Sequence, residues 1–274
     1  MSFLTAIIYG VIQGLSEFLP VSSSGHLALL PYFMAFQDPG VLFDLCLHLG
    51  TAGAVLWYFR ERILGLLSVL GPAIIDFRVQ NDRLNFLRNF ILATGASVVS
   101  ILLLKPLSAY GRGPWMIMLN QVVFGLVLWM ADIYQRKQTH VEAGYFERAL
   151  RWKVAVFIGV AQAIAIFPGV SRSGITLSAA FFMGIDRSQA GAFSFLLSLP
   201  IIIAGVLVEI PDIALAAKAG QFDLTVLCVG VVTSFVVGLI TIHFFMKLIA
   251  RIQLVWFTGY RLALAGVLLY FLTR

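Results

Sequence analysis

The sequence predicts an all-α polytopic membrane protein with an inverted-topology repeat, made of about six full transmembrane helices and two opposed re-entrant helical hairpins. The first observation behind this fold class is composition: 60% of the 274 residues are hydrophobic and 12% are charged, whereas soluble proteins have about 45–50% apolar and about 25% charged residues. The second is that the apolar residues form blocks of membrane-spanning length. The third is that a polar-interrupted apolar segment occurs twice.

Six of the apolar blocks are long enough for a full crossing, because roughly 20 helical residues span the hydrocarbon core of a bilayer. Alternation of polar and apolar residues at the roughly ten-residue spacing of an outer-membrane barrel is not visible. We therefore predict helices rather than strands, at residues 41–59, 89–108, 115–134, 190–209, 224–246 and 254–272.

The basic residues predict how these helices are oriented. Most of them fall in the connections 60–88 and 135–153, and three more lie in short connections, namely Arg187, Lys247 and Arg251. The opposite side receives only Lys105, Arg112, Lys218 and Arg274. Because cytoplasmic loops of membrane proteins are enriched in Lys and Arg, the first group is expected to be cytoplasmic. This topology explains the net charge of +6, so we expect no nucleic-acid partner.

Two shorter apolar regions, residues 3–36 and 154–184, must each enter and leave the membrane on one side in this topology. We predict that both are re-entrant hairpins, the first entering from outside and the second from the cytoplasm. No Lys or Arg precedes Arg60, so the basic region of a cleavable signal peptide is missing. The N-terminus is therefore expected to be retained and to face outward.

An internal repeat connects the two hairpins. Residues 10–25 align with residues 159–174 at a constant offset of 149, and half of the pairs are identical, including a glutamine and a Ser-x-Ser-Gly ending. We interpret this as common ancestry of two halves, about 1–140 and 141–274, within a single membrane domain that spans residues 1–274. Inverted repeats place their sites near the midplane, where broken helices meet. Function is therefore expected at the two hairpin tips.

The first tip collects polar side chains in an apolar segment. Gln13 and Glu17 are four residues apart on one helix face, and Pro20 is expected to end that helix. A run of small polar residues then caps the returning helix and can bind an anion at the positive end of its dipole: Ser22, Ser23, Ser24 and Gly25. A carboxylate at membrane depth needs a partner, and a metal ion beside an anion site is one. His26 adds a group that titrates near neutral pH.

The second tip is again a helix stop followed by a hydroxyl-rich capping turn. Its polar and small residues are Gly169, Ser171, Arg172, Ser173, Gly174 and Thr176, after Pro168. A guanidinium at membrane depth needs an anionic partner, and its planar fork suits a phosphate. A structural pair between Arg172 and Glu17 across the repeat would also satisfy both charges. The two interpretations are compatible if the pair opens for a substrate.

Other polar residues in the spans carry weaker signals. Asp44 and His48 are four residues apart at the outer end of the 41–59 helix, and we interpret them as an interfacial pair, with support of the site as the alternative. Arg261 could hold the last helix to the bundle or to a lipid headgroup, and both options stay open. Cys46 and Cys228 have no metal-ligand spacing and are interpreted as small core residues.

The two tip motifs resemble those of the BacA-type undecaprenyl pyrophosphate phosphatase (undecaprenyl-diphosphatase) family. They are Gln13-x-x-x-Glu17 followed by Pro-Val-Ser-Ser-Ser-Gly-His26, and Pro168-Gly-Val-Ser-Arg-Ser-Gly-Ile-Thr176. The resemblance implies hydrolysis of undecaprenyl diphosphate to undecaprenyl phosphate and phosphate, which recycles the lipid carrier of peptidoglycan synthesis. It also implies a multi-pass protein of the bacterial inner membrane with its site open to the periplasmic side, dependence on Mg²⁺ or Ca²⁺, and bacitracin resistance. Many members have Glu where this chain has Gln13, so one carboxylate fewer is available for a metal.

The resemblance also assigns roles by motif position. Glu17 would hold the divalent cation with help from Gln13, and Arg172 would clamp the phosphates. The backbone and hydroxyls of both turns would bind the substrate, which implicates Ser22, Ser24, Gly25, Gly169, Ser171, Ser173, Gly174 and Thr176. Ser23 is the candidate nucleophile and His26 its base, with direct attack by His26 or activation of water as open alternatives.

The expected partners are the lipid diphosphate and membrane lipids, with a homodimer possible. A polyprenyl-phosphate transporter on the same fold is the rival interpretation, because opposed re-entrant hairpins are also the architecture of alternating access. Glu17 and His26 beside the phosphate-binding turns favour catalysis, since a carrier for an anion gains little from an extra carboxylate.

Overall fold

The computed structural model describes residues 1–34, 39–69, 82–138, 150–218 and 223–273. All regular elements in this part of the chain are helices, which confirms the predicted fold class. In chain order they are α1 (Phe3–Ser16), α2 (Ser23–Met34), α3 (Val41–Tyr58), α4 (Arg60–Leu67), α6 (Asp82–Leu104), η1 (Lys105–Arg112), α7 (Pro114–Lys137), α9 (Trp152–Ala163), η2 (Ile164–Ile166), α10 (Arg172–Phe182), α11 (Arg187–Lys218), α12 (Leu224–Leu248) and α13 (Val255–Leu272).

The long helices match the six predicted crossings. Five of them, α6, α7, α11, α12 and α13, are long and apolar enough to span a membrane, and α3 with α4 forms a sixth candidate that bends by 72°. The two largest differences from the predicted boundaries are that α6 begins at Asp82 and that α11 continues to Lys218, because a helix does not have to end where its sequence becomes less apolar. Large apolar side chains such as Leu103, Val208 and Trp256 are exposed on the outside of the bundle, as a lipid-facing surface requires.

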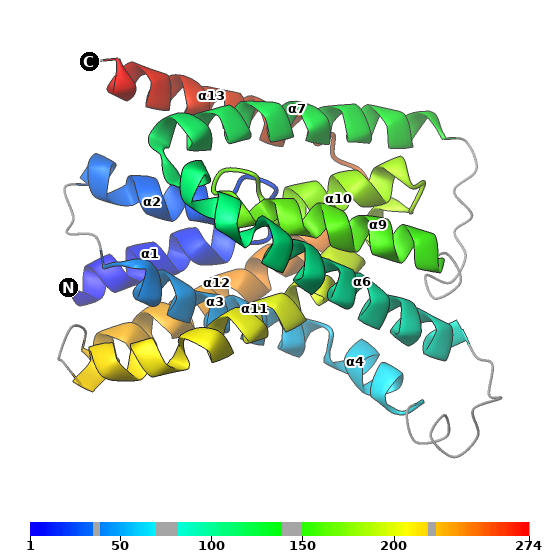
Figure 1. Ribbon diagram of the computed structural model, residues 1–274, viewed down its shortest axis with the longest axis horizontal. Helices are drawn as coiled ribbons and strands as arrows, with labels where there is room; N and C mark the ends of the chain where they lie inside the picture. The colour runs from blue at the N-terminus through cyan, green and yellow to red at the C-terminus, as the bar shows by residue number, and fades with distance from the viewer. Residues whose placement is uncertain (35–38, 70–81, 139–149, 219–222, 274) are drawn as a thin grey trace.

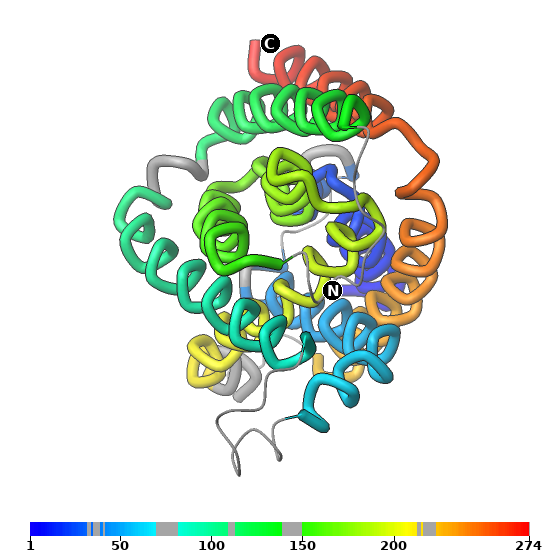
Figure 2. The backbone as a smooth tube through the Cα atoms, turned by 90° about the vertical axis from the view of Figure 1, so that its right-hand side faces the viewer, coloured from blue at the N-terminus to red at the C-terminus, as the bar shows by residue number. Residues whose placement is uncertain are grey.

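The two predicted hairpins are present and approach each other from opposite ends of the molecule. In Figure 1, α1 and α2 extend from the end that carries the N-terminus, and α9 and α10 extend from the other end. Figure 2, a view along the long axis, shows both hairpins surrounded by the longer helices. Their tips therefore lie in the interior, away from both ends.

The first hairpin turns earlier than predicted. Helix α1 ends at Ser16, and Pro20 lies within the turn that follows instead of ending the helix directly. The reason is that a proline ring clashes with the carbonyl four residues before it, which here belongs to Ser16. The regular α-helix therefore stops before Pro20, and Glu17, which still has helical φ and ψ and donates its N–H to the Gln13 carbonyl at 3.0 Å, is the residue that caps it.

Each hairpin packs on a long helix from the other predicted half. Helix α1 lies on α12, where a Cβ at Gly10 would be only 2.6 Å from the carbonyl oxygen of Gly230. Helix α9 lies on α6 in the same way, through Gly159, the repeat partner of Gly10. The Oγ of Ser97 in α6 donates to the Gly159 carbonyl at 2.9 Å. Small residues allow this close approach of helices in a membrane, so the two halves interlock.

Some of the predicted features lie outside the described residues. They include three of the basic residues used to orient the chain, Arg78, Arg148 and Arg274, and the boundary between the two halves at residues 140 and 141. The division into halves stays a prediction.

Candidate active site

The two predicted tips meet near the centre of the molecule (Figure 1) and contain the same turn. Ser22 and Ser171, which are repeat partners, have φ values of 76° and 72°. The hydroxyl oxygen of Ser22 lies 3.3 Å from that of Ser24, and the hydroxyl oxygen of Ser171 lies 3.3 Å from that of Ser173. Left-handed conformations are uncommon for residues other than glycine and cluster at functional sites. The repeat thus reproduces a strained turn at the start of both α2 and α10.

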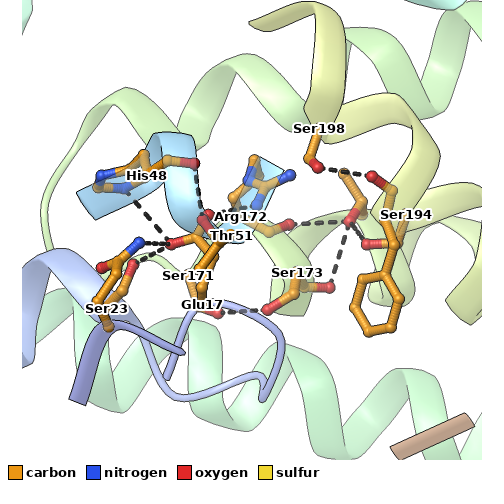
Figure 3. A network of polar contacts seen from close by, with 12 residues as sticks. Glu17, Ser23, His48, Thr51, Ser171, Arg172, Ser173, Ser194 and Ser198 are labelled. Carbon is orange, nitrogen blue, oxygen red and sulfur yellow. Dashed lines mark hydrogen bonds and ion pairs between the residues drawn. The ribbon is translucent and has the colours of Figure 1, made fainter. Parts of the chain in front are cut away.

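Glu17 is the centre of the contacts between the tips (Figure 3). Its carboxylate is buried and pairs through Oε1 with the guanidinium of Arg172, which begins α10 in the other hairpin. Its second oxygen, Oε2, accepts hydrogen bonds from the Ser23 hydroxyl at 2.6 Å and from the Gln13 amide at 3.0 Å. The predicted pair of Glu17 with Arg172 across the repeat is therefore present, and it holds the nucleophile candidate Ser23 in the same network.

His48 belongs to the site, which the sequence interpretation gave only as its alternative. Its Nε2 lies 3.4 Å from Glu17 Oε2, and its Nδ1–H donates to the backbone carbonyl of Asp44 at 2.8 Å. The interpretation of His48 as part of an interfacial pair is wrong, because α3 brings the ring against the hairpin tip (Figure 3). The available signal was a histidine about two turns inside an apolar span, where a polar side chain is costly unless it has a partner.

His26 points away from the Glu17 network. Its Nδ1–H donates to the carbonyl of Ser22 at 2.7 Å, and its Nε2 lies 2.6 Å from the hydroxyl oxygen of Tyr260 in α13. The two rings stack with an interplanar angle of 5°. The predicted contact of His26 with Ser23 is thus absent: α2 begins at Ser23, which places His26 in the first turn with its ring held back against Ser22. A role for His26 as base stays a prediction.

A cavity of about 290 Å³ opens beside this network. We call its polar lining residues the polar end: Ser16, Glu17, Ser22, Ser23, Ser24, His48, Gln162, Ser171 and Arg172. We call its apolar lining residues the apolar end: Leu45, Ile101, Ala165, Ile166, Ile201, Ile202 and Gly205. A concave site with converging polar groups and an otherwise apolar lining suits an amphiphilic ligand, with a polar head and a hydrophobic tail.

The remaining residues predicted to bind substrate build the turns and do not line the cavity: Gly25, Gly169, Ser173, Gly174 and Thr176. Gly169 has a φ of 90°, and a Cβ there would lie 2.6 Å from a backbone carbonyl oxygen of α7. The Ser173 hydroxyl donates to the carbonyl of Leu19 at 3.1 Å and so ties the second tip to the first. The Thr176 hydroxyl lies 2.5 Å from that of Ser194, inside the bundle.

The Glu17 carboxylate and the Gln13 Oε1 could act as ligands of a divalent cation. The Gln13 Oε1 is buried and has no hydrogen-bond partner among the described residues, and it belongs to the amide that contacts the Glu17 carboxylate. Within the same residues, no group of three or more His, Cys, Asp and Glu side chains could hold a metal ion. Mg²⁺ and Ca²⁺ prefer oxygen ligands, and Mg²⁺ in particular is often bound by few protein ligands together with substrate phosphates. Glu17 and Gln13 fit such a shared site.

Comparison with known proteins identifies the family of this chain. The family described as bacitracin resistance protein BacA matches residues 6–267. The undecaprenyl-diphosphatase 2 of Stutzerimonas stutzeri (strain A1501) is 39% identical over 271 residues, which cover 98% of each chain. The undecaprenyl-diphosphatase of Aliivibrio salmonicida (strain LFI1238) is 38% identical over 274 residues, which cover 99% of each chain. This chain therefore belongs to the bacitracin resistance protein BacA family.

Proposed function

We propose that this chain is an enzyme that hydrolyses undecaprenyl diphosphate to undecaprenyl phosphate and phosphate, and so recycles the lipid carrier of peptidoglycan synthesis. Its family and the names of two full-length relatives support this activity. The observation that carries the proposal is the convergence of Ser23, Glu17 and Arg172 at one cavity. Ser23 provides a hydroxyl nucleophile, Glu17 a proton acceptor, and Arg172 a positive charge that can bind phosphate.

The two ends of the cavity correspond to the two parts of this substrate. The diphosphate carries negative charge and fits the end with the guanidinium of Arg172 and the hydroxyls of both turns. The first isoprene units fit the apolar end between α6 and α11, which supplies Ile101 and Ile201. Both helices carry exposed apolar residues on their outer sides, so the rest of the prenyl chain can continue into lipid.

The contacts at Glu17 indicate how the reaction begins. We assign Ser23 Oγ as the nucleophile that attacks the terminal phosphorus, while its proton passes to Glu17 Oε2, 2.6 Å away. The bond from that phosphorus to the bridging oxygen breaks, and undecaprenyl phosphate leaves as an anion. Water then hydrolyses the phosphoserine and releases phosphate. Arg172, freed from Glu17 by the incoming phosphates, stabilises the charge on the transferred group.

The proposal includes a divalent cation, Mg²⁺ or Ca²⁺, with Glu17 and Gln13 as its protein ligands. When bound, such a cation supplies neutralisation of phosphate charge and orientation of the leaving group. The unpartnered Gln13 Oε1 supports this assignment, because a buried acceptor without a partner is costly.

We assign the protein to the bacterial inner membrane, with the site open to the periplasmic side. Helix α4, which contains Arg60 and Arg62, and the C-terminal end of α7, which carries Arg136 and Lys137, lie toward the end of the molecule from which α9 and α10 extend (Figure 1). The apolar end of the cavity lies toward the other end, since Ile101 comes three residues before the end of α6 at Leu104. A cytoplasmic location of the basic end, as the positive-inside rule requires, makes the cavity face outward.

Transport of a polyprenyl phosphate is less well supported. The opposed hairpins are compatible with alternating access, but a carrier of an anion has no use for a buried carboxylate that accepts the proton of Ser23. No contact among the described residues favours transport over hydrolysis.

The decisive assay is phosphate release from undecaprenyl diphosphate by the purified protein in detergent with Mg²⁺ or Ca²⁺. Wild type should turn over, and Ser23→Ala should be slower by about a thousandfold or more. Ser68→Ala, at an exposed serine in the C-cap of α4, is the control and should keep full activity. Absence of phosphate release by the wild type, together with movement of the lipid phosphate across vesicles, would establish transport instead.

A further inference from the structure

Arg261 in α13 is the largest side chain with no exposed surface in the described part of the chain. None of the described ion pairs involves it. Its guanidinium and Nε donate instead to five backbone carbonyls, at 2.7–3.4 Å: those of Pro20, Asn120, Gln121, Gly169 and Val170. It therefore contacts both hairpin tips and α7 at once.

Two amides of α7 complete this arrangement. The side chain of Asn120 donates to the carbonyl of Pro168 at 2.8 Å, and that of Gln121 donates to the carbonyl of Val21 at 3.2 Å. We call Asn120, Gln121 and Arg261 the rear cradle. Together with the Ser173 hydroxyl, the cradle engages three consecutive carbonyls in each tip, at residues 19–21 and 168–170. These are the same positions of the repeat, 149 residues apart.

The cradle determines which side of each turn faces the cavity. Its donors hold the carbonyls on the side of α7 and α13, and the left-handed residues Ser22 and Ser171 then reverse the chain. The first residues of α2 and α10, including Ser23 and Arg172, consequently line the cavity. Free backbone N–H groups at the start of a helix favour an anion. Arg261 does not line the cavity, so it acts from behind the turns.

The charge of Arg261 indicates that this residue does more than hold the two turns in place. A buried charge is costly unless it is compensated, and neutral amides already fulfil the structural task in Asn120 and Gln121. Arg187, the other arginine with such deep burial, is neutralised by Asp132 and donates to the carbonyls of Ile249 and Ile252. Of the two buried arginines among the described residues, Arg261 is the one without an acidic partner, and it lies behind the turns where the two phosphates are proposed to bind.

We propose that Arg261 is a positioning residue: it sets the spacing of the two phosphate-binding turns and adds positive potential behind the diphosphate. This rests on the proposed function, since it concerns the same site. Lysine at this position keeps the charge but has a single nitrogen, so it cannot replace the three nitrogens with which Arg261 donates to five carbonyls. A misplacement of about 1 Å in reacting groups can cost about a hundredfold in rate.

The test compares Arg261→Lys with Arg187→Lys in kcat, KM and thermal unfolding, with undecaprenyl diphosphate as substrate. Both variants are expected to lower the unfolding temperature, because both disturb a buried arginine. Arg261→Lys should lose kcat by about a hundredfold with a smaller rise in KM, whereas Arg187→Lys should keep kcat within about twofold. Equal loss of kcat in both variants, or unchanged kcat in Arg261→Lys, overturns the proposal.

A binding measurement separates this proposal from the proposed function. Inorganic pyrophosphate should raise the unfolding temperature of the wild type and of Arg187→Lys by similar amounts, and that of Arg261→Lys by less. Wild type that is stabilised by pyrophosphate but releases no phosphate would refute the hydrolase while leaving the cradle intact. If Arg261→Lys does not fold, Asn120→Ala and Gln121→Ala decide, since each removes one donor to one tip. Wild-type kcat in both of these variants contradicts the cradle.

Discussion

Glu17 converts two separate hairpin tips into one site. It lies at the end of α1, and its two oxygens face different partners: Arg172 from the second hairpin on one side, and Ser23 with Gln13 on the other. A buried carboxylate without such partners would be strongly unfavourable. The same contacts support its proposed role as a base. The oxygen that accepts the hydrogen bond of the Ser23 hydroxyl in the resting state is placed to take up the proton during attack.

This assignment predicts non-additive effects of substitutions. Ser23→Ala and Glu17→Gln should each lower kcat by orders of magnitude, and the double variant should lose no more than the worse single variant, since the two residues act as a unit. His26→Asn combined with Ser23→Ala should instead multiply the separate losses, because His26 contacts Tyr260 and not Ser23. Steady-state kinetics of the wild type, the three single variants and the two double variants measure both cycles. Coupling of His26 with Ser23 as strong as that of Glu17 with Ser23 would restore His26 as the base.

The glutamine at position 13 leads to a prediction about the cation. Gln13→Glu adds a carboxylate next to Glu17, where the amide now donates at 3.0 Å. Two adjacent carboxylates repel each other without a cation and bind one more tightly. We expect a lower unfolding temperature in EDTA and half-maximal activity at a lower Mg²⁺ or Ca²⁺ concentration than in wild type. Titration of activity after chelation tests this, and an unchanged midpoint would remove Gln13 from the cation site.

At the level of elements, the proposed binding mode has different helices contact the diphosphate and the prenyl chain of the substrate. The short hairpin helices supply the polar end of the cavity, while α6 and α11 supply its apolar end through residues such as Ile101 and Ile201. Gly205 leaves space there, because a Cβ at this position would meet only Leu45, at 4.0 Å. The length of prenyl chain that the enzyme accepts near the diphosphate is therefore expected to depend on α11.

Filling this space should discriminate between substrates. Gly205→Phe is expected to raise KM for undecaprenyl diphosphate and farnesyl diphosphate by about tenfold or more, through lost apolar burial, while isopentenyl diphosphate is affected less. Gly266→Phe, at an exposed glycine of α13 with open space around it, is the matched control. Kinetics over the series of chain lengths provide the measurement. An equal loss for all lengths would indicate general disruption of the fold, and no loss would move the prenyl chain elsewhere.

Across the whole molecule, the parts predicted well from sequence are those with a local signal. The six crossings follow from apolar blocks, and the tips follow from polar interruptions that recur at a fixed offset. The contacts of His48 and Arg261 could not be predicted in this way, because they join residues 31 and more than 90 positions apart in the chain. The orientation of His26 likewise depends on Tyr260, in the last helix. Long-range packing determines these features, and a single sequence does not display it.

The interlocked halves explain why the site needs the complete fold. Helix α1 lies on α12 and α9 lies on α6, so each hairpin is held by the half to which it does not belong in the predicted repeat. The Glu17 carboxylate and the Arg172 guanidinium meet only because both hairpins are inserted. Neither tip contains the complete set of groups required for phosphoryl transfer.

The most direct test of this account measures phosphate release from undecaprenyl diphosphate after one change in each tip. Ser23→Ala alters the first tip, and Arg172→Lys alters the second while it keeps the charge and removes the planar fork. We predict that each variant folds, as judged by thermal unfolding, and that turnover falls by about a thousandfold or more in Ser23→Ala and by about a hundredfold or more in Arg172→Lys. Near-wild-type turnover in either variant would contradict a site assembled from both tips.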